Sequence, residues 1–288
     1  MQRLRSECIS CILDKHLTAY PEETSEKDRV AYMQRLLGIL AAAPLEHGAP
    51  QIMEDVEDLQ KEMFGREARY AQIKRHFNDV MLGYVPEVKA ELEAADDPLA
   101  LAVHYALSGN YIDFGAMQHV DEEKLRALLR EKTPLDSGAL ARFRQSLKAA
   151  HRLLYITDNC GEIVMDGLLM DTIVKLFPQI SVKVMVRGGE VLNDAAMEDA
   201  DQVGLTARYP VIGNGTRVAG TCTDRLEGEA LEAWEEADII LAKGQGNFET
   251  LRLCGRNVYY LFLCKCPMFA RTFHVPRFTG MLLHDSEI

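Results

Sequence analysis

The sequence Leu-Leu-Tyr-Ile-Thr-Asp-Asn-Cys-Gly-Glu, residues 153–162, indicates most clearly how this chain folds. Its first four residues form a short apolar run, and a helical pattern follows from Ile163 to Phe177. Asp158 and Asn159 therefore lie at the carboxyl end of a predicted strand, the edge where ligands bind in open α/β sheets. Their side-chain oxygens suit a cation such as Mg²⁺ or Mn²⁺. The alternative is an Asx turn in which Asn159 caps the next helix.

A second polar group follows the next predicted strand, residues 180–186. The chain continues through Arg187 and reaches Asn193 and Asp194 before another helical segment begins. Parallel strands end at the same edge of a sheet, so Asp194 is expected beside the first Asp-Asn pair, and the three side chains would offer three oxygen ligands to one cation. Arg187 is placed to meet an anionic substrate, and the alternative is a solvated surface arginine.

Strands and helices alternate from residue 151 to the end of the chain. Strands are predicted at 153–157, 180–186, 209–212, 238–242 and 257–263. Helices are predicted at 162–177, 194–203, 226–236 and 247–254. This alternation indicates parallel βαβ units with right-handed crossovers. We therefore expect an α/β fold with a Rossmann-like, mostly parallel sheet flanked by helices.

The first half of the chain has a helical pattern throughout. Apolar residues recur at three- and four-residue spacing, which predicts helices at 30–42, 51–65, 67–78, 96–107, 122–130 and 137–150. Prolines punctuate this region at Pro44, Pro50, Pro86 and Pro98. The charges of the stretch from residue 51 to 63 are interpreted as the solvated face of an amphipathic core helix. The prediction is an all-helical N-terminal domain, 1–150, and an α/β domain, 151–288, that carries the metal site.

Composition narrows the class of protein. The chain has 288 residues, 48% hydrophobic content and a net charge of −12, which is enough for a large core and argues against a general nucleic-acid binder. It contains no apolar run of about 18 residues and no apolar signal core near its start, so neither membrane insertion nor export is expected. Seven cysteines, an odd number, suggest reduced thiols and a cytoplasmic location. Composition does not predict the oligomeric state.

Two further loops are expected at the same sheet edge. Gly244 and Gly246 follow the strand at 238–242, and Lys265 follows the strand at 257–263. The glycines would let backbone N–H groups approach an anion at a helix N-terminus, and the lysine would bind a phosphate as a point charge. An ordinary glycine-rich turn and a solvated lysine are the alternatives. Four such loops on one edge favour a shared anion and metal site.

Several enzyme classes are disfavoured by missing motifs. The Gly244-Gln245-Gly246 loop lacks the third glycine of a dinucleotide fingerprint, and the loop after the first strand is not glycine-rich. The chain contains no P-loop motif and no Gly-x-Ser-x-Gly nucleophile elbow. Its eight histidines are scattered, which makes a histidine zinc site improbable.

Taken together, the ordered motifs resemble the damage-control phosphatase family, also called ARMT-like and formerly a domain of unknown function. The matching segments span nearly the whole chain: Cys8-Ile9-Ser10-Cys11, Gly109-Asn110-Tyr111-Ile112-Asp113-Phe114-Gly115, Asp158-Asn159-Cys160-Gly161-Glu162, Asn193-Asp194 after Arg187-Gly188, Gly244-Gln245-Gly246-Asn247-Phe248-Glu249, and Lys265-Cys266. The Cys-x-x-Cys pair is similar to that of the family's stand-alone prokaryotic-type branch.

The resemblance implies a metal-dependent phosphatase that acts on small phosphorylated metabolites such as sugar phosphates or phosphopantetheine-type compounds. It implies one divalent cation, Mn²⁺, Mg²⁺, Co²⁺ or Ni²⁺, held by Asp158, Asn159 and Asp194. The resemblance implies that Lys265 contacts the substrate phosphate. Asp158, Lys265 and Glu249 are the predicted catalytic residues, and either Glu249 or Asp113 is the predicted proton carrier. The remaining implied substrate-site residues are Asn110, Asp113, Glu162, Arg187, Gly188, Asn193, Gly244, Gly246 and Asn247.

Three questions stay open from the sequence. The nucleophile is either water or the Asp158 carboxylate. The competing functions are an S-adenosylmethionine-dependent methyltransferase, which the missing glycine-rich loop disfavours, and a binding protein that holds a phosphorylated ligand without hydrolysing it. Cys8 and Cys11 share a helical face and would supply two of four zinc ligands, so Cys264 and Cys266 would complete a site only if the fold brings the N-terminus to the last predicted strand. A redox pair and ordinary packing are the alternatives for these thiols.

Overall fold

The computed structural model describes residues 3–65, 69–114, 120–131 and 135–288. Two expectations touch residues outside these ranges. Gly115, the last residue of the Gly-Asn segment, lies outside them, and so does the predicted start of the 67–78 helix. No helix in the part of the chain that the structure describes is long and apolar enough to cross a membrane.

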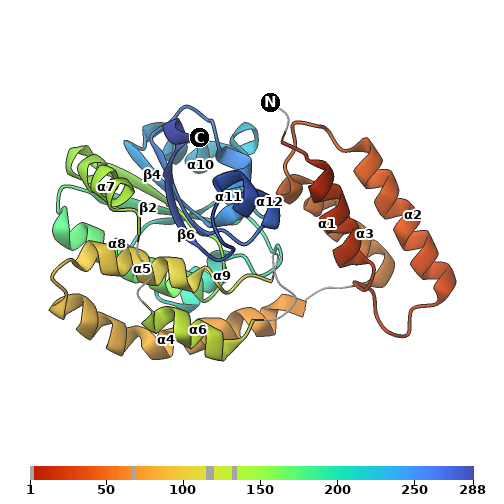
Figure 1. Ribbon diagram of the computed structural model, residues 1–288, viewed down its shortest axis with the longest axis horizontal. Helices are drawn as coiled ribbons and strands as arrows, with labels where there is room; N and C mark the ends of the chain where they lie inside the picture. Colours follow the sequence, from red (N-terminus) through yellow and green to blue (C-terminus); the bar gives the residue numbers. More distant parts are fainter. Residues whose placement is uncertain (1–2, 66–68, 115–119, 132–134) are drawn as a thin grey trace.

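A six-stranded sheet forms the centre of the molecule (Figure 1). Its strand order is β3-β2-β1-β4-β5-β6; the first five strands are parallel, and β6 is antiparallel to β5. The strands are β1 Arg152–Ile156, β2 Ser181–Val186, β3 Val211–Gly213, β4 Ile239–Lys243, β5 Val258–Leu263 and β6 Gly280–His284. The predicted fold class, a mostly parallel sheet flanked by helices, is confirmed.

Both faces of the sheet are buried, which explains why its strands have continuous apolar runs. Successive side chains of a strand point to opposite faces. Accordingly Leu153 and Tyr155 of β1 belong to one hydrophobic cluster, and Leu154 and Ile156 belong to the other. In β5 every residue is buried. A strand buried on both faces reads as an unbroken apolar run, as parallel strands in α/β proteins do.

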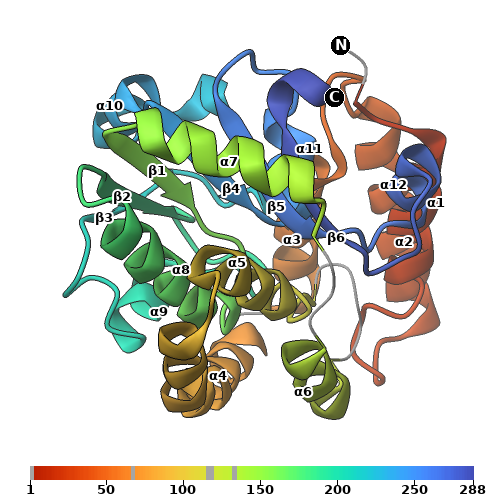
Figure 2. The same ribbon diagram turned by 60° about the vertical axis from the view of Figure 1, so that its left-hand side comes forward.

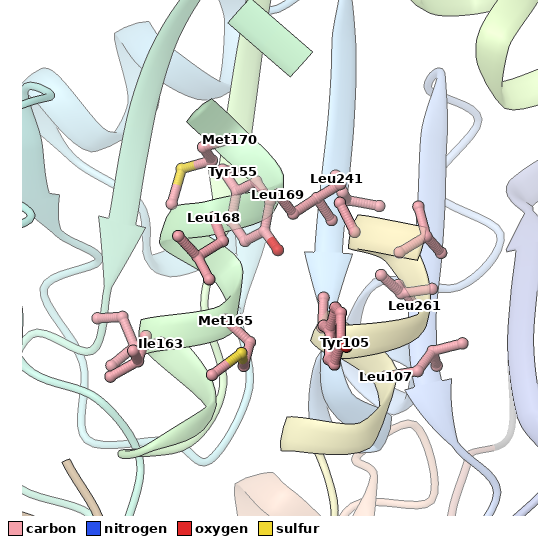
Figure 3. Packing of buried hydrophobic residues seen from close by; sticks show 14 of the residues in the cluster. Tyr105, Leu107, Tyr155, Ile163, Met165, Leu168, Leu169, Met170, Leu241 and Leu261 are labelled. Atoms are coloured by element: carbon pink, nitrogen blue, oxygen red, sulfur yellow. The ribbon is translucent and has the colours of Figure 1, made fainter. Parts of the chain in front are cut away.

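Helices cover each face. Helices α4 to α9 contribute to the cluster on the first face (Figure 2), and α10, α11 and α12 pack on the second. In the first cluster, Tyr105 and Leu107 of α5 and Met165 of α8 pack with Tyr155 and Leu241 of the sheet (Figure 3). The covering helices are α4 Arg69–Ala94, α5 Pro98–Gly109, α6 Glu122–Arg130, α7 Ser137–Ala149, α8 Glu162–Leu176, α9 Met197–Gln202, α10 Gly228–Glu236, α11 Gly244–Leu251 and α12 Pro267–Phe273.

The first three helices have a separate hydrophobic core. Helices α1 Ser6–His16, α2 Glu26–Ala42 and α3 Ala49–Phe64 enclose a third cluster that includes Tyr32, Leu36 and Val56 (Figure 1). Helices α4 to α7, by contrast, share a cluster with the sheet. The boundary between clusters therefore does not coincide with the change to strand and helix alternation near residue 151. The division of the chain into domains at residue 150 stays a prediction.

Several element boundaries differ from the prediction. Helix α4 continues through Pro86, which was predicted to punctuate two elements, because Met81 and Val88 on either side are both buried against the core. Helix α11 begins at Gly244 rather than at residue 247. Neither β6 nor α12 was predicted, because their five- and seven-residue patterns are too short to distinguish from loop and β6 depends on pairing with β5.

Candidate functional site

The predicted loops meet at the topological switch point of the sheet. Strands β1 and β4 are neighbours at the centre of the strand order, and the flanking strands follow them in opposite directions. Asp158 follows β1 and Gly244 follows β4. The two loops are in close contact, because a Cβ atom added to Gly244 would overlap the Asp158 carboxylate, and Gly244 has a φ of +79° that favours glycine.

The three candidate cation ligands lie together. The backbones of Asn159 and Asp194 form an isolated antiparallel bridge. The Asn159 Nδ2 atom donates a hydrogen bond of 2.7 Å to Oδ2 of Asp158. All three side chains are buried. The structure therefore brings together the residues that the sequence predicted as ligands, and their role as cation ligands stays a prediction.

Arg187 joins the two carboxylates of this group. Its Nη2 atom donates to Oδ1 of Asp158 at 3.1 Å, and its Nε atom donates to Oδ2 of Asp194 at 2.6 Å. The third nitrogen, Nη1, donates to Oδ1 of Asn247 at 3.1 Å. The alternative of a solvated surface arginine is wrong, because the Arg187 side chain is 0% exposed. In this arrangement the guanidinium fixes the spacing of the two carboxylates.

A second buried cluster of ion pairs lies around Lys243, and the sequence did not predict it. Lys243 Nζ lies 2.6 Å from Oε1 of Glu162 and 2.7 Å from Oδ1 of Asp166. The same Asp166 oxygen accepts a hydrogen bond from Tyr155, whereas Oδ2 of Asp166 is buried without a partner among the described residues. Burial acts to lower the pKa of Lys243, but the charges of Asp166 and Glu162 outweigh it and raise that pKa.

The helical region reaches the site through the segment after α5. Asn110 Nδ2 donates to Oδ2 of Asp158 at 3.2 Å and to Oε2 of Glu162 at 2.9 Å, and its Oδ1 accepts from the backbone of Leu263. Asp113 forms an ion pair of 2.6 Å with Nζ of Lys265. This segment therefore links the loop after β1 to the loop after β5. The resemblance implied only that Asn110 and Asp113 reach the site from the helical region.

Asn193 and Asn247 connect backbone segments. Asn193 donates to the backbone oxygen of Ile112 and accepts from the backbone N–H of Phe114. Asn247 donates to the backbone oxygens of Thr157 and Lys243. Both side chains are fully buried. Their observed contacts hold the loops in place, while a direct contact of either residue with substrate stays a prediction.

Two predicted substrate-site glycines lie where backbones pack closely. A Cβ atom on Gly188 would come within 2.5 Å of the Thr216 backbone nitrogen, and one on Gly246 would overlap the Ala219 oxygen. Both positions therefore require glycine for packing. Because packing alone explains why both positions are glycine, the role of Gly188 and Gly246 in phosphate binding stays a prediction.

Glu249 lies at the edge of this network. Its Oε1 accepts a hydrogen bond of 3.2 Å from Gln245, whose own side-chain oxygen accepts from the backbone of Lys265. A Cβ atom on Gly48, just before α3, would be 3.7 Å from the Glu249 Cβ, so this residue faces the first three helices. Burial raises the pKa of the Glu249 carboxyl above its ordinary value.

The charge of the site favours an added cation. Its ion pairs join five carboxylates to three cationic side chains, an excess of two negative charges when all are ionised: Asp113, Asp158, Glu162, Asp166 and Asp194 against Arg187, Lys243 and Lys265. Burial, then the charges of Asp194 and Glu162, hold the pKa of Asp158 well above its ordinary value. Burial raises the pKa of Asp194 to about 6 despite Arg187. A divalent cation would offset this excess.

The donor set also fits a hard cation. Among the described residues, none donates a hydrogen bond to Oδ1 of Asn159 or to Oδ1 of Asp194, which leaves both atoms for another partner. Two carboxylates and one carboxamide would supply three oxygens and leave further positions for water and substrate. In the same part of the chain, no group of three or more His, Cys, Asp or Glu side chains is arranged to hold a metal. The candidate set is therefore mixed, with Asn159 completing it.

The cysteines do not form a second metal centre among the described residues. The fold does bring α1 beside α12, since Glu7 pairs with Arg271 at 3.2 Å (Figure 1). The required proximity of the N-terminus to the loop after β5 is therefore met. However, all seven cysteines are free thiols, and no suitable ligand group is found among the residues described.

Glu57 of α3 is a further buried acidic residue that sequence reasoning missed. The charges of its helix were interpreted as a solvated face, yet its Oε1 atom is buried and accepts no hydrogen bond from the residues that the structure describes. Burial, then the charge of Asp194, raise the pKa of Glu57 to about 8. The only available signal was its position between Val56 and Leu59, which shows that it is near the buried side of α3.

Known proteins match this chain along nearly its whole length. A family model described as the damage-control phosphatase ARMT1-like domain matches residues 4–279. The chain is 31% identical over 284 residues to a protein named damage-control phosphatase PH1575 from Pyrococcus horikoshii, with 96% of each covered. It is 32% identical over 275 residues to a damage-control phosphatase from Archaeoglobus fulgidus, which covers 92% of this chain and 93% of the relative.

A solved structure extends the comparison to the fold. The crystal structure of a protein of the former domain-of-unknown-function-89 family from Pyrococcus horikoshii superposes with a TM-score of 0.77. The two chains are 26% identical, and the match covers 99% of each. The arrangement of both the helical region and the sheet is therefore similar in the two proteins.

Proposed function

This chain belongs to the family of damage-control phosphatase ARMT1-like domains, and from that premise we propose that it hydrolyses small phosphorylated metabolites with the help of one divalent cation. The family resemblance drawn from the sequence motifs is confirmed. Relatives named damage-control phosphatase support phosphatase activity. The cation, the individual roles of the residues and the substrate are our proposals, with sugar phosphates and phosphopantetheine-type compounds as the classes to examine first.

One observation carries the proposal: two buried carboxylates and a carboxamide meet at the switch point of the sheet, in a cluster with excess negative charge. Asp158, Asn159 and Asp194 would hold the cation, and Arg187 would keep the two carboxylates aligned. A bound cation would supply positive charge to the phosphoryl oxygens. Positioning and electrostatics account for most of the catalysis of phosphoryl transfer, and this arrangement supplies both.

Lys265 is the proposed phosphate contact. Its ammonium group is buried and held by Asp113, so its position is set before substrate binds. Gln245 accepts hydrogen bonds from the backbone N–H groups of Lys265 and Cys266 and thereby connects this loop to the start of α11. Helix α11 begins at Gly244, which packs against the Asp158 carboxylate. The free backbone N–H groups at the start of this helix favour a negatively charged group beside them.

Glu249 is the proposed proton carrier. Burial raises its pKa, so its carboxyl group retains a proton at a higher pH than an exposed glutamate does. A carboxyl group of this kind can deliver a proton to a leaving oxygen. Gln245 is the residue through which Glu249 is connected to the Lys265 loop.

Phosphate release tests the proposal. Purified protein would be stripped of metal and assayed with an aryl phosphate and a panel of sugar phosphates after addition of Mn²⁺, Mg²⁺, Co²⁺ or Ni²⁺. We expect release with at least one cation and no more than background release without any. Cation binding without any release would instead favour a binding protein.

A thermal-shift measurement separates the remaining alternative. A methyltransferase would be stabilised by S-adenosylmethionine, because a ligand that binds only the folded state raises the unfolding temperature. We expect stabilisation by a divalent cation and none by S-adenosylmethionine. The opposite pattern would replace the phosphatase proposal with the methyltransferase one.

A further inference from the structure

Glu162 lies beside the proposed cation ligands, but donors of the protein surround its carboxylate. Its Oε2 atom accepts hydrogen bonds from Nδ2 of Asn110 at 2.9 Å, from Nδ2 of Asn159 at 2.9 Å and from the backbone N–H of Asn159 at 3.3 Å. Its Oε1 atom accepts from Nζ of Lys243 at 2.6 Å. A carboxylate accepts about four hydrogen bonds, so these donors use the capacity that Glu162 would need for a substrate.

Lys243 is occupied in the same way. Its Nζ atom donates to the backbone oxygen of Ala106 at 3.0 Å, to Oε1 of Glu162 at 2.6 Å and to Oδ1 of Asp166 at 2.7 Å. These acceptors use every N–H of the ammonium group, and the side chain is 0% exposed. Lys243 is therefore a buried link between β4 and α8, and its ammonium group is not placed to bind a phosphate.

Two carboxylates decide which way the amide of Asn159 points. Its Nδ2 atom donates to Oδ2 of Asp158 at 2.7 Å and to Oε2 of Glu162 at 2.9 Å. The reversed amide would place its carbonyl oxygen against two carboxylate oxygens, none of which can donate a hydrogen bond. The observed orientation leaves Oδ1 of Asn159 on the other side of the amide, where it accepts no hydrogen bond from the described residues. This oxygen is the atom that a cation would bind, since an amide nitrogen is no ligand for a hard cation.

The contacts of Lys243 hold Glu162 against that amide. An unpaired carboxylate at a fully buried position would be costly, and the ammonium group of Lys243 compensates it. Asp166 lies four residues after Glu162 on the same face of α8 and binds the ammonium group from the next turn. The same Asp166 oxygen accepts a hydrogen bond of 2.7 Å from Tyr155, which lies in the first hydrophobic cluster (Figure 3). A line of buried contacts therefore leads from the core to Asn159.

We propose that Lys243 is a positioning residue for the cation site: it holds Glu162, and Glu162 holds the amide of Asn159 with its carbonyl oxygen free for a divalent cation. This role rests on the proposed function and deepens it. It assigns Lys243 a part in cation binding, and it changes the role proposed for Glu162 from a substrate contact to the orientation of a ligand. Residues that orient metal ligands in this way commonly change metal affinity by about 10–100-fold.

Mn²⁺ binding to metal-stripped protein, measured by titration calorimetry without substrate, tests this role. Glu162→Gln is expected to weaken binding by roughly 10–100-fold, because an uncharged amide holds Asn159 less firmly and can pair with its carbonyl oxygen. Lys243→Met is expected to weaken binding by roughly tenfold or more. Since Lys243 acts through Glu162, adding Lys243→Met to Glu162→Gln should weaken binding by less than about twofold further.

Tyr155→Phe is the matched structural control. It removes a buried hydrogen bond to Asp166 and leaves the ion pair of Lys243 with Glu162 in place. We expect a lower unfolding temperature, as the loss of a buried hydrogen bond causes, and a Mn²⁺ affinity within about twofold of the wild type. Lys243→Gln, which keeps an N–H donor but not the charge, replaces Lys243→Met if that variant does not fold, with the same expected loss.

The results distinguish this role from the proposed function. Wild-type affinity in Glu162→Gln or in the folded Lys243 variant overturns the positioning role alone, and so does an equal loss of affinity in Tyr155→Phe. Full additivity of the Glu162 and Lys243 substitutions also overturns it, because the two residues would then act independently. No Mn²⁺ binding by the wild type, or binding that Asp158→Ala retains in full, overturns the proposed cation site as well.

Discussion

Gly244 shows how a single residue couples backbone conformation to the proposed cation site. Its positive φ is open to glycine at little cost, and the space that a side chain would need is filled by the carboxylate of Asp158. Gly255 also has a positive φ, +73°, but a Cβ atom there would contact nothing within 4 Å. The two positions therefore separate backbone strain from collision with the site.

Alanine substitutions at these glycines are predicted to differ in activity. Each is expected to cost about 1–2 kcal/mol of stability from the left-handed backbone. Gly244→Ala should in addition displace Asp158 and reduce phosphate release by at least roughly a hundredfold, as misplaced catalytic groups do. Gly255→Ala should retain near wild-type activity. Equal activity of the two variants, measured with the same aryl phosphate, would show that the contact with Asp158 is unimportant.

Glu57 is predicted to make the unfolding free energy depend on pH. Its pKa rises from an ordinary value of 4.5 to about 8 in the folded protein because of burial and the charge of Asp194, while Arg217 acts against the shift and Asp58 and Glu54 add to it. The folded state holds the proton more tightly, so the stabilisation is complete below pH 4.5 and is lost as the pH rises toward 8.

The measurement compares wild type with Glu57→Gln. The unfolding temperature of the wild type should fall more steeply between pH 5 and 8 than that of the variant, which carries no titratable group at this position. Glu62→Gln serves as the exposed control and should follow the wild type. Parallel curves for all three proteins would mean that Glu57 titrates normally.

At the scale of elements, the ends of strands and the starts of helices carry the site. Strand β4 ends at Lys243, and helix α8 begins at Glu162. The ion pairs of Lys243 with Glu162 and Asp166 join these two elements next to the loop that carries the proposed cation ligands. All three side chains are 0% exposed. A fully buried cluster of this kind destabilises strongly when one partner is lost, because the other charges remain without compensation.

Lys243→Met is therefore predicted to destabilise the protein by about 3–5 kcal/mol. The substitution keeps the approximate side-chain volume and removes only the charge. Lys175→Met, at the exposed end of α8, should change stability by less than about 0.5 kcal/mol. Urea denaturation of both variants provides the comparison. If Lys243→Met unfolds at the wild-type midpoint, the cluster does not contribute as proposed.

The site residues that could be predicted from the sequence are those at the carboxyl ends of apolar strands. Asp158, Asn159 and Asp194 were predicted together because each follows a strongly apolar strand and parallel strands share an edge. Asn110 and Asp113 were suggested only by family resemblance, since nothing in a helical pattern shows which loop reaches a distant sheet.

Other buried residues were missed for physical reasons. A lysine at the end of a strand and a glutamate on an amphipathic helix both look solvated in a sequence, and only tertiary packing shows that Lys243 is fully buried and that the Oε1 atom of Glu57 is buried. Strand β6 was missed for a related reason. Its five residues become a strand by pairing with β5, and that contact is not encoded in their local pattern.

At the scale of the whole molecule, the hydrophobic clusters define two units. Helices α1 to α3 enclose their own core, and helices α4 to α12 pack with the sheet. Contacts between the units include the ion pairs Arg217–Asp58 and Arg225–Glu54, which are partly exposed and therefore contribute little stability. The first unit is thus expected to loosen without unfolding the second.

Leu36→Ala is predicted to loosen the first three helices selectively. Leu36 is fully buried in their core, so its truncation should cost about 2–5 kcal/mol there. Amide hydrogen exchange should accelerate in residues 6–64, while strands β1, β4 and β5 remain protected. Leu37→Ala, at a neighbouring residue that is 50% exposed, should leave exchange nearly unchanged. Equal acceleration throughout the chain for Leu36→Ala would indicate a single cooperative unit.

The proposed activity depends on the carboxylate of Asp158 and on a divalent cation together. Metal-stripped wild type, Asp158→Ala and the control Asp171→Asn, a partly exposed acid that pairs with Arg208, would be assayed for phosphate release from an aryl phosphate as Mn²⁺ is added back. We predict release that rises with Mn²⁺ in the wild type and in Asp171→Asn, and no release at any concentration from folded Asp158→Ala. Full activity of Asp158→Ala, or release that is indifferent to the cation, would contradict the proposed metal-dependent phosphatase.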